Sequence, residues 1–91
     1  MDRQKFADVW EALSDTPAEA ESMRMRSSLL IAIEQKVAAW GITQAEAARR
    51  LGVTQPRLND LLKGKIEKFS LDTLIDLAGR SGLRVRLDIA A

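Results

Sequence analysis

The chain has 91 residues, 46% of them hydrophobic and 30% charged, and its formal net charge is +1. These values are typical of one soluble globular domain and exclude an intrinsically disordered chain. The lack of cysteine excludes disulfide and thiolate chemistry, and the lack of histidine removes the commonest general base and metal ligand. Because the sequence shows neither a membrane-spanning apolar run nor a signal peptide, we expect a cytoplasmic protein without membrane contact.

Charge is unevenly distributed along the chain. Residues 1–21 hold six acidic and two basic side chains, whereas residues 43–68 hold six basic and three acidic side chains. A local excess of positive charge is more informative about nucleic-acid binding than the net charge of the whole chain. The middle of the sequence is therefore the candidate nucleic-acid-binding region.

The first fifteen residues form a separate amphipathic segment. Phe6, Val9, Trp10 and Leu13 follow the i, i+3, i+4, i+7 spacing that places side chains on one face of a helix. Such a short helix needs a surface to lie on. The sequence leaves open whether that surface is the protein's own core or a partner protein.

A long helix is predicted from Pro17 to about Trp40. Thr16 and Glu19 form a capping box around Pro17, a residue that fits the first turn, and Gly41 is a typical helix end. The expected buried stripe of this helix consists of Leu30, Ile33, Val37 and Trp40.

Three shorter helices are predicted at about 44–51, 55–62 and 71–81. Thr43, Thr54 and Ser70 can cap their amino ends, and a glycine follows each of them at positions 52, 64 and 82. Leu74, Leu77 and Ala78 are expected to face inward from the last helix. Residues 16–83 are therefore interpreted as one helical DNA-binding domain, with its motif at 43–64.

The tail at 84–91 changes to the period of a strand. Arg84 to Ile89 alternate polar and apolar residues, which is typical of a half-buried strand. One strand cannot make a sheet, so it either pairs with another chain or stays unpaired. We favour pairing with its copy in a second subunit.

Residues 43–64 carry the pattern of a helix-turn-helix. The first helix needs a small residue where it meets the second, and Ala48 supplies it, with Ala45 and Ala47 nearby. Gly52 follows at the turn, where positive φ is expected. The apolar anchors of the second helix are predicted to be Leu58 and Leu61, assisted by Leu62.

The segment TQAEAARRLGVTQPRLNDLLKG, residues 43–64, resembles the helix-turn-helix of the lambda-repressor-like (XRE/Cro) family. The flanking segments FADVWEALSDTPAEAESMRMRSSLLIAIEQ and KIEKFSLDTLIDLAGRSGLRVRLDI resemble the HigA-type antitoxin branch of type II toxin–antitoxin systems. The resemblance implies an all-α, lambda-repressor-like domain with an extra N-terminal helix and a short C-terminal β-strand used in dimerisation.

The same resemblance implies a homodimeric repressor of its own operon. It would bind an inverted-repeat operator in double-stranded DNA and neutralise a RelE/HigB-like toxin that cleaves mRNA. No cofactor and no metal are implied.

One alternative is a stand-alone XRE-type regulator from a phage or plasmid with no toxin partner, and another is an interaction module that no longer binds DNA. An enzyme is disfavoured because no catalytic spacing of residues is present.

Eight residues are the candidate DNA-binding residues. They are Gln44, Thr54, Gln55, Arg57, Asn59, Asp60, Lys63 and Lys65. Arg49 and Arg50 are interpreted instead as a solvated helix face. Pro56 stands where family members carry a polar residue, so one base contact is expected to be missing.

The expected roles of these residues differ with their position. The resemblance implies that Gln44 contacts a phosphate, because family members commonly do so at the start of this helix. Lys63 and Lys65 are also expected to contact phosphates, and Thr54 begins a helix whose amides suit a phosphate oxygen. Gln55 is the favoured base reader, because glutamine can form two hydrogen bonds with adenine.

Three further candidates lie on the same helix, and two of them have alternative roles. Arg57 is expected either to bind guanine or to hold the DNA backbone. Asn59 lies further along the same helix. The resemblance implies that Asp60 stands at a position that can face bases, where its carboxylate either accepts a hydrogen bond from cytosine or disfavours wrong sequences.

Overall fold

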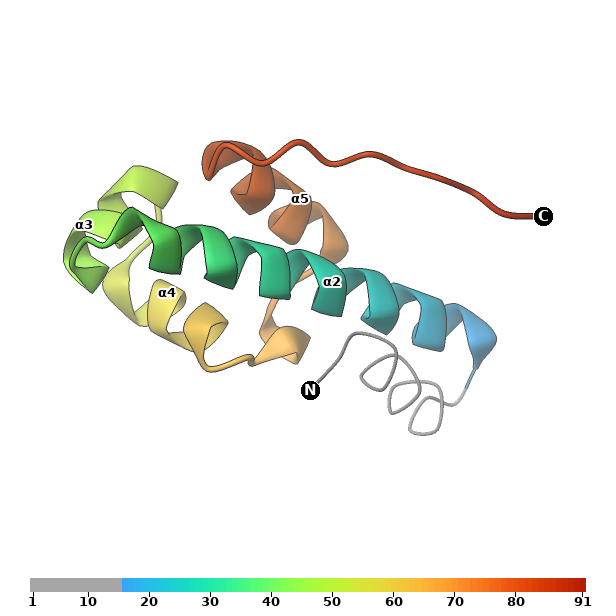
Figure 1. Ribbon diagram of the computed structural model, residues 1–91. Helices are drawn as coiled ribbons and strands as arrows, with labels where there is room; N and C mark the ends of the chain where they lie inside the picture. The colour runs from blue at the N-terminus through green and yellow to red at the C-terminus, as the bar shows by residue number, and fades with distance from the viewer. Residues whose placement is uncertain (1–15) are drawn as a thin grey trace.

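The computed structural model describes residues 16–91, and every described regular element is helical. Figure 1 shows a long α2 (Pro17–Trp40), to which the shorter α3 (Gln44–Leu51), α4 (Gln55–Leu62) and α5 (Leu71–Arg80) are joined. A short 3₁₀ turn, η1 (Ile66–Lys68), lies between α4 and α5. The predicted all-α fold is confirmed, and the four predicted helices of residues 16–91 are found within one residue of their expected bounds. The predicted N-terminal helix with Phe6, Val9, Trp10 and Leu13 lies outside the described residues.

Each α-helix begins at a hydroxyl side chain that accepts a hydrogen bond from the amide three residues later. The first amides of a helix have no partner within it, so a hydroxyl oxygen at this position stabilises the helix by about 1 kcal/mol. The distances are 3.1 or 3.2 Å at all four helices. These caps confirm the helix starts predicted at Thr16, Thr43, Thr54 and Ser70.

The hydrophobic core lies where α2 meets the other helices. Leu30, Ile33 and Val37 of α2 are buried, as predicted. From the other helices, Leu51, Leu58, Leu61, Leu74, Leu77 and Ala78 complete the same cluster. Burying each large side chain contributes roughly 1.5–3 kcal/mol. Trp40, predicted in the buried stripe, is only half-buried and packs against the edge of the core.

The segment between α4 and α5 contains core residues that the sequence reading did not identify. Ile66 in η1 and Phe69 directly after it are 5% and 1% exposed. Gly64, with a φ of 73°, turns the chain from α4 toward this segment. Leu62, in contrast, was predicted as an assisting anchor of α4 and is exposed, so that prediction is wrong. It lies one position beyond Leu61, where the helix already turns away from the core.

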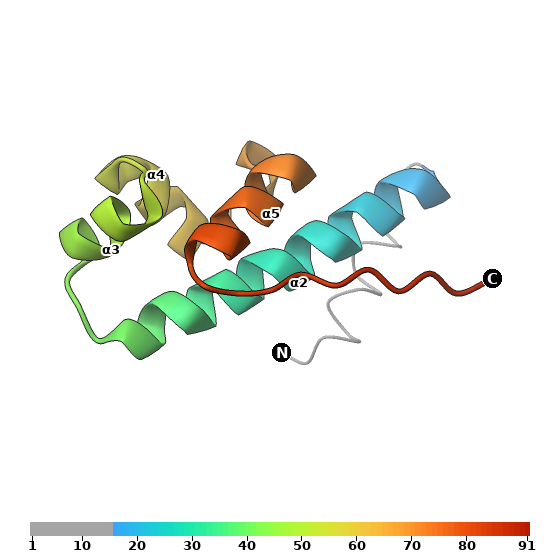
Figure 2. The ribbon, with the colours of Figure 1, turned by 90° about the horizontal axis from the view of Figure 1, so that it is seen from above.

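The tail after α5 is extended and forms no strand within this chain. Figures 1 and 2 show it leaving α5 and running toward the N-terminal end of α2 without joining another extended segment. Residues 83–91 carry no regular secondary structure. The strand predicted at 84–89 is therefore absent from the single chain. The physical reason is that a strand requires hydrogen bonds from a neighbour, and no other described segment supplies one.

Candidate nucleic-acid interface

The bend between α3 and α4 has the geometry that a helix-turn-helix requires. Gly52 has a φ of 72°, and its amide hydrogen-bonds to the carbonyl oxygen of Arg49. The amide of Val53 donates to the carbonyl oxygen of Ala48 at 3.0 Å. Ala47 and Ala48 are both buried, so the two helices can approach closely. The predicted glycine turn and small-residue contact are confirmed, and Gly52 accepts its left-handed conformation because it lacks a Cβ.

The amino end of α4 is exposed. Thr54, Gln55 and Pro56 are all exposed. The Thr54 hydroxyl accepts from the amide of Arg57 at 3.2 Å, and its carbonyl accepts from the amide of Leu58. Pro56 has no amide hydrogen. The amide of Gln55 is therefore the one in this turn that remains for a phosphate oxygen, fewer than the sequence reading expected.

Gln44, Asn59 and Lys63 come together around one shallow depression between α2, α3 and α4. Gln44 is the first residue of α3 and is half-buried, like Asn59, whereas Lys63 at the end of α4 is exposed. Glu34 of α2 lines the same depression, and burial raises the pKa of its carboxyl. The depression places three predicted contacts side by side, and Asn59 lines it together with residues of α2 and α3.

Arg57 is packed against the protein itself. Its guanidinium lies over the ring of Phe69, 4.1 Å from the ring centroid. Its Nη1 also donates to the carbonyl oxygen of Lys68 at 3.0 Å. A cation over an aromatic face and a charged hydrogen bond both stabilise this position. The structure therefore gives Arg57 a role that the sequence did not predict, which is to join α4 to the end of η1 and to Phe69 directly after it.

Asp60 is held by two lysines. Its two carboxylate oxygens lie 3.3 Å from Lys65 Nζ and 3.4 Å from Lys68 Nζ. These contacts, with that of Lys65 the largest, lower the pKa of Asp60 below its ordinary value. The carboxylate is occupied by the protein's own cations, which is a different arrangement from the free base-facing carboxylate that was expected.

The two cationic residues of α3 lie on its exposed face. Arg49 and Arg50 are both exposed, in agreement with the expected solvated face. The Arg50 guanidinium lies over the ring of Trp40, 4.6 Å from its centroid.

Among residues 16–91, the structure contains no group of histidine, cysteine, aspartate and glutamate side chains that could hold a metal ion. The same part of the chain contains no helix with the length and apolar character needed to cross a bilayer.

The structure thus separates the eight predicted residues into three groups. Thr54 and Gln55 are exposed at the end of α4. Gln44, Asn59 and Lys63 surround the depression between α2, α3 and α4. Arg57 and Asp60 of α4 contact the segment after this helix, and Lys65 belongs to that segment and pairs with Asp60. The sequence placed Lys68 in the basic region but did not predict that Lys68 and Phe69 contact α4, because they become its neighbours only through the turn at Gly64.

Comparison with known proteins agrees with this geometry. A family model described as a helix-turn-helix domain matches residues 12–90, which is most of the chain. No curated protein is significantly similar to the sequence.

Proposed function

The chain belongs to the helix-turn-helix domain family, and we propose that it is a sequence-specific DNA-binding regulator that represses transcription of its own operon. The observation that carries this proposal is the exposed amino end of α4, supported on α3 by the bend at Gly52. An α-helix presented in this way fits the major groove of B-DNA, whose base edges carry a distinct pattern of donors and acceptors.

Gln55 is the proposed base reader. It is exposed at the first position of α4, and its side-chain amide can donate to and accept from one adenine. Thr54 and the free amide of Gln55 are proposed to hold a phosphate next to that base. Gln44 and Lys63, which both line the depression beside α4, are proposed to contact the neighbouring phosphates of the DNA backbone.

A homodimer on an inverted repeat is the proposed DNA-bound form. One helix-turn-helix of this size reads only a half-site, and two-fold readers place two recognition helices one DNA turn apart, roughly 34 Å. The extended tail, whose residues 84–91 form no backbone hydrogen bond to the described part of the chain, is the proposed contact between the two copies. The repeat of the operator would then reflect the symmetry of the dimer.

The finer proposal is that this regulator is the antitoxin of a type II toxin–antitoxin pair. The support is the resemblance of the segments on both sides of the motif to HigA-type antitoxins. The partner would be a RelE/HigB-like toxin that cleaves mRNA, and the regulator itself would have no catalytic role. If no toxin partner exists, the same DNA-binding surface belongs to a stand-alone regulator.

Binding to DNA from the chain's own promoter tests the first proposal. Anisotropy titrations with this duplex and a scrambled duplex are expected to show tighter binding to the promoter. The affinity is expected to fall steeply with salt, because bound lysines release counterions from the phosphates. Equal affinity for both duplexes would contradict sequence-specific regulation.

Coexpression with the neighbouring open reading frame tests the antitoxin proposal. The neighbour is expected to be toxic alone, to be silenced by this chain and to copurify with it. A harmless neighbour that does not copurify would leave the DNA-binding regulator without a toxin role.

A further inference from the structure

One face of α2 is buried without belonging to the core. Ala20, the fourth residue of this helix, is only 2% exposed, yet it is not a member of the cluster that α2 forms with the other described helices. Figures 1 and 2 show the N-terminal end of α2 extending beyond α3, α4 and α5. These helices therefore do not account for the burial of Ala20.

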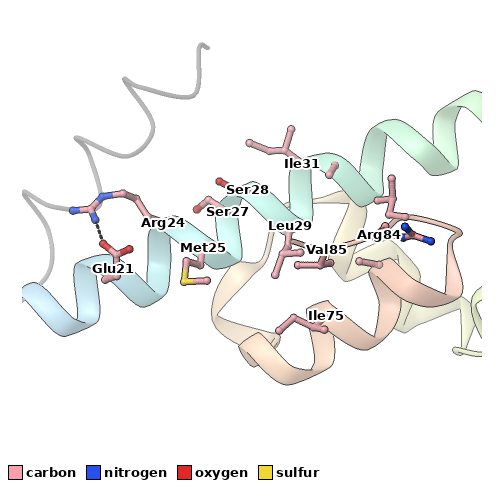
Figure 3. Close-up of a pocket in the computed structure, with 13 residues that line it drawn as sticks. Glu21, Arg24, Met25, Ser27, Ser28, Leu29, Ile31, Ile75, Arg84 and Val85 are labelled. Carbon is pink, nitrogen blue, oxygen red and sulfur yellow. Dashed lines mark hydrogen bonds and ion pairs between the residues drawn. The ribbon is translucent and has the colours of Figure 1, made fainter. Parts of the chain in front are cut away.

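Ser27 lies on the same face of α2, because it follows Ala20 by two helical turns. It is 4% exposed, and its hydroxyl oxygen has no hydrogen-bond partner within residues 16–91. Half-buried Ile31, one turn further along, continues this face and lines the groove beside α2. Figure 3 shows Ile31 on the side of α2 away from Ile75 of α5, whereas Leu29 lies on the side toward it. Because buried hydroxyl groups are normally hydrogen-bonded, the partner of this face must supply a polar group as well as apolar ones.

The amphipathic segment before α2 has the length and the pattern to cover this face. Its predicted apolar stripe consists of Phe6, Val9, Trp10 and Leu13. Residues 14–16 are all that separate this stripe from the first residue of α2. A connection of two to five residues between helices makes them antiparallel neighbours. Thr16 is extended, with φ −134° and ψ 154°, so the chain changes direction directly before α2.

An antiparallel arrangement would align the two faces. Leu13 and Phe6 are seven residues apart, a separation of about 10 Å along a helix. Ala20 and Ser27 have the same separation. Leu13 would then lie beside Ala20, and Phe6 would lie near Ser27. Asp8 falls on the other side of the predicted helix and would point to solvent.

Trp10 can supply the hydrogen bond that Ser27 lacks. Side chains on a helix lean toward the N-terminus of that helix. In an antiparallel pair, Trp10 and Ser27 would therefore lean toward each other. A buried indole N–H needs an acceptor, and a hydroxyl oxygen is one. The contact would satisfy both groups at once.

We propose that residues 6–13 form a helix that packs antiparallel against Ala20, Ser27 and Ile31 of α2, with the Trp10 indole N–H donating to Ser27 Oγ. The segment is favoured over a second copy or another protein because its covalent attachment gives it a high effective concentration at this face. Docked in this way, its acidic side chains are held at the end of α2 opposite to α3, away from the proposed DNA contact.

The sign of the effect of Ser27→Ala tests the hydrogen bond. If Trp10 donates to Ser27, removing the hydroxyl leaves the indole unpaired, and the urea midpoint of unfolding is expected to fall. In the Trp10→Phe background the hydroxyl has no donor, so Ser27→Ala is expected to raise the midpoint. Ser28→Ala, at the neighbouring half-buried serine, is the matched control for the higher helix propensity of alanine.

Tryptophan fluorescence tests the contact between the two helices. Trp10 and Trp40 are the two tryptophans of the chain, so Trp10 is the only emitter in a Trp40→Phe variant. Its emission is expected to be blue-shifted and poorly quenched by acrylamide. Adding Ala20→Asp places a charge in the contact and is expected to raise the quenching constant several-fold. Ala18→Asp makes the same change at an exposed position of the same turn and is expected to leave quenching unchanged.

Crosslinking shows which copy of α2 the segment covers, because the natural chain has no cysteine. Val9→Cys combined with Ser27→Cys is expected to be bridged by a short bis-maleimide within one chain, giving a product of monomer mass. Asp8→Cys combined with Ser27→Cys is the matched control. Its first thiol lies on the opposite side of the predicted helix and is expected to be bridged several-fold less.

Three results would overturn the proposal. A midpoint that rises for Ser27→Ala more than for Ser28→Ala would show that the hydroxyl has no partner. Strong quenching of Trp10 that Ala20→Asp does not change would show that the segment does not cover α2. A bridged product of dimer mass would place the segment on a second copy. Because these assays contain no DNA, their failure is separate from failure of the proposed function, and circular dichroism checks that each variant remains helical.

Discussion

Arg80 of α5 donates a hydrogen bond from Nη1 to the carbonyl oxygen of Leu51, the last residue of α3, at 3.1 Å. The same guanidinium contacts Asp76 one turn earlier in α5, with 2.9 Å between Nε and Oδ2. The carbonyl groups at the end of a helix have no partner within it, and a cation is favourable there. Arg80 therefore connects the last helix to the bend of the helix-turn-helix.

Replacing Arg80 by alanine is expected to reduce the free energy of unfolding by about 1–2 kcal/mol, because the bond to Leu51 is charged and partly buried. Asp76→Asn is the matched control. It removes only the exposed ion pair within α5, which contributes about 0.3–0.5 kcal/mol. Urea unfolding of the two variants gives both values. Equal losses would show that the contact with Leu51 does not stabilise the bend.

Gly52 lies directly against Arg80, so this glycine has two reasons to be present. A Cβ at Gly52 would lie 2.5 Å from Arg80 Nη1, and the φ of 72° already disfavours a side chain. Gly41 also has a positive φ, but nothing lies within 4 Å of its Cβ position. Gly41→Ala is therefore expected to cost about 1–2 kcal/mol from backbone strain alone, and Gly52→Ala is expected to cost more.

The Arg80→Ala background isolates the contact at Gly52. In that background, the additional loss from Gly52→Ala is expected to approach that of Gly41→Ala, because the blocking guanidinium has been removed. Thermal unfolding of the four variants makes this comparison. If Gly52→Ala costs the same with and without Arg80, the close approach has no energetic consequence.

Arg57 is expected to act on the stability of the fold more than on base recognition. Arg57→Ala removes the stacking on Phe69 and the bond to Lys68, and is expected to cost about 1–2 kcal/mol of unfolding free energy. Arg49→Ala on the exposed face of α3 is the control and is expected to change stability by less than about 0.5 kcal/mol. If Arg57 instead reads guanine, its replacement will reduce operator affinity while leaving affinity for a scrambled duplex and stability unchanged.

The sequence predicts the helices of this fold well because their signals are local. Thr16, Thr43, Thr54 and Ser70 cap helices through atoms only three residues apart. The roles of Arg57 and Asp60 could not be predicted in this way. Their partners follow the turn at Gly64, and no periodic pattern places Phe69 or Lys68 beside α4. The available signal in the sequence was Phe69, an aromatic residue that follows a short loop after α4.

The tail shows a different limit of sequence reasoning. Its alternating pattern indicates a strand, but the pattern does not contain the neighbour that a strand needs. The structure accordingly leaves residues 84–91 extended and without backbone hydrogen bonds to any of the residues 16–91. Gln55, in contrast, is exposed as predicted because a polar residue at the start of a capped helix has no apolar surface to cover it.

Asp60 is expected to restrain DNA binding of every sequence. Asp60→Asn removes a negative charge and releases Lys65 and Lys68, so affinity for both operator and scrambled duplexes is expected to rise. The slope of log affinity against log salt is expected to steepen by about 0.9 for each phosphate gained. A loss confined to the operator would show instead that Asp60 accepts from cytosine.

The acid dependence of the same contact has a defined sign. Because the lysines lower the pKa of Asp60, its contribution to stability is present above the ordinary aspartate pKa and is lost as the pH falls through the lowered value. Between roughly pH 6 and 8 the carboxylate stays ionised. The effect of Asp60→Asn on DNA affinity is therefore expected to be constant over that range.

The central claim is that the exposed end of α4 reads bases while the residues around it hold phosphates. Titrations of Gln55→Ala and Lys63→Ala against operator and scrambled duplexes at several salt concentrations test it most directly. Gln55→Ala is expected to lose about 1–3 kcal/mol on the operator and almost nothing on the scrambled duplex, whereas Lys63→Ala is expected to weaken both and to flatten the salt slope by about 0.9. Equal losses for Gln55→Ala on the two duplexes, or no loss on either, would contradict the claim.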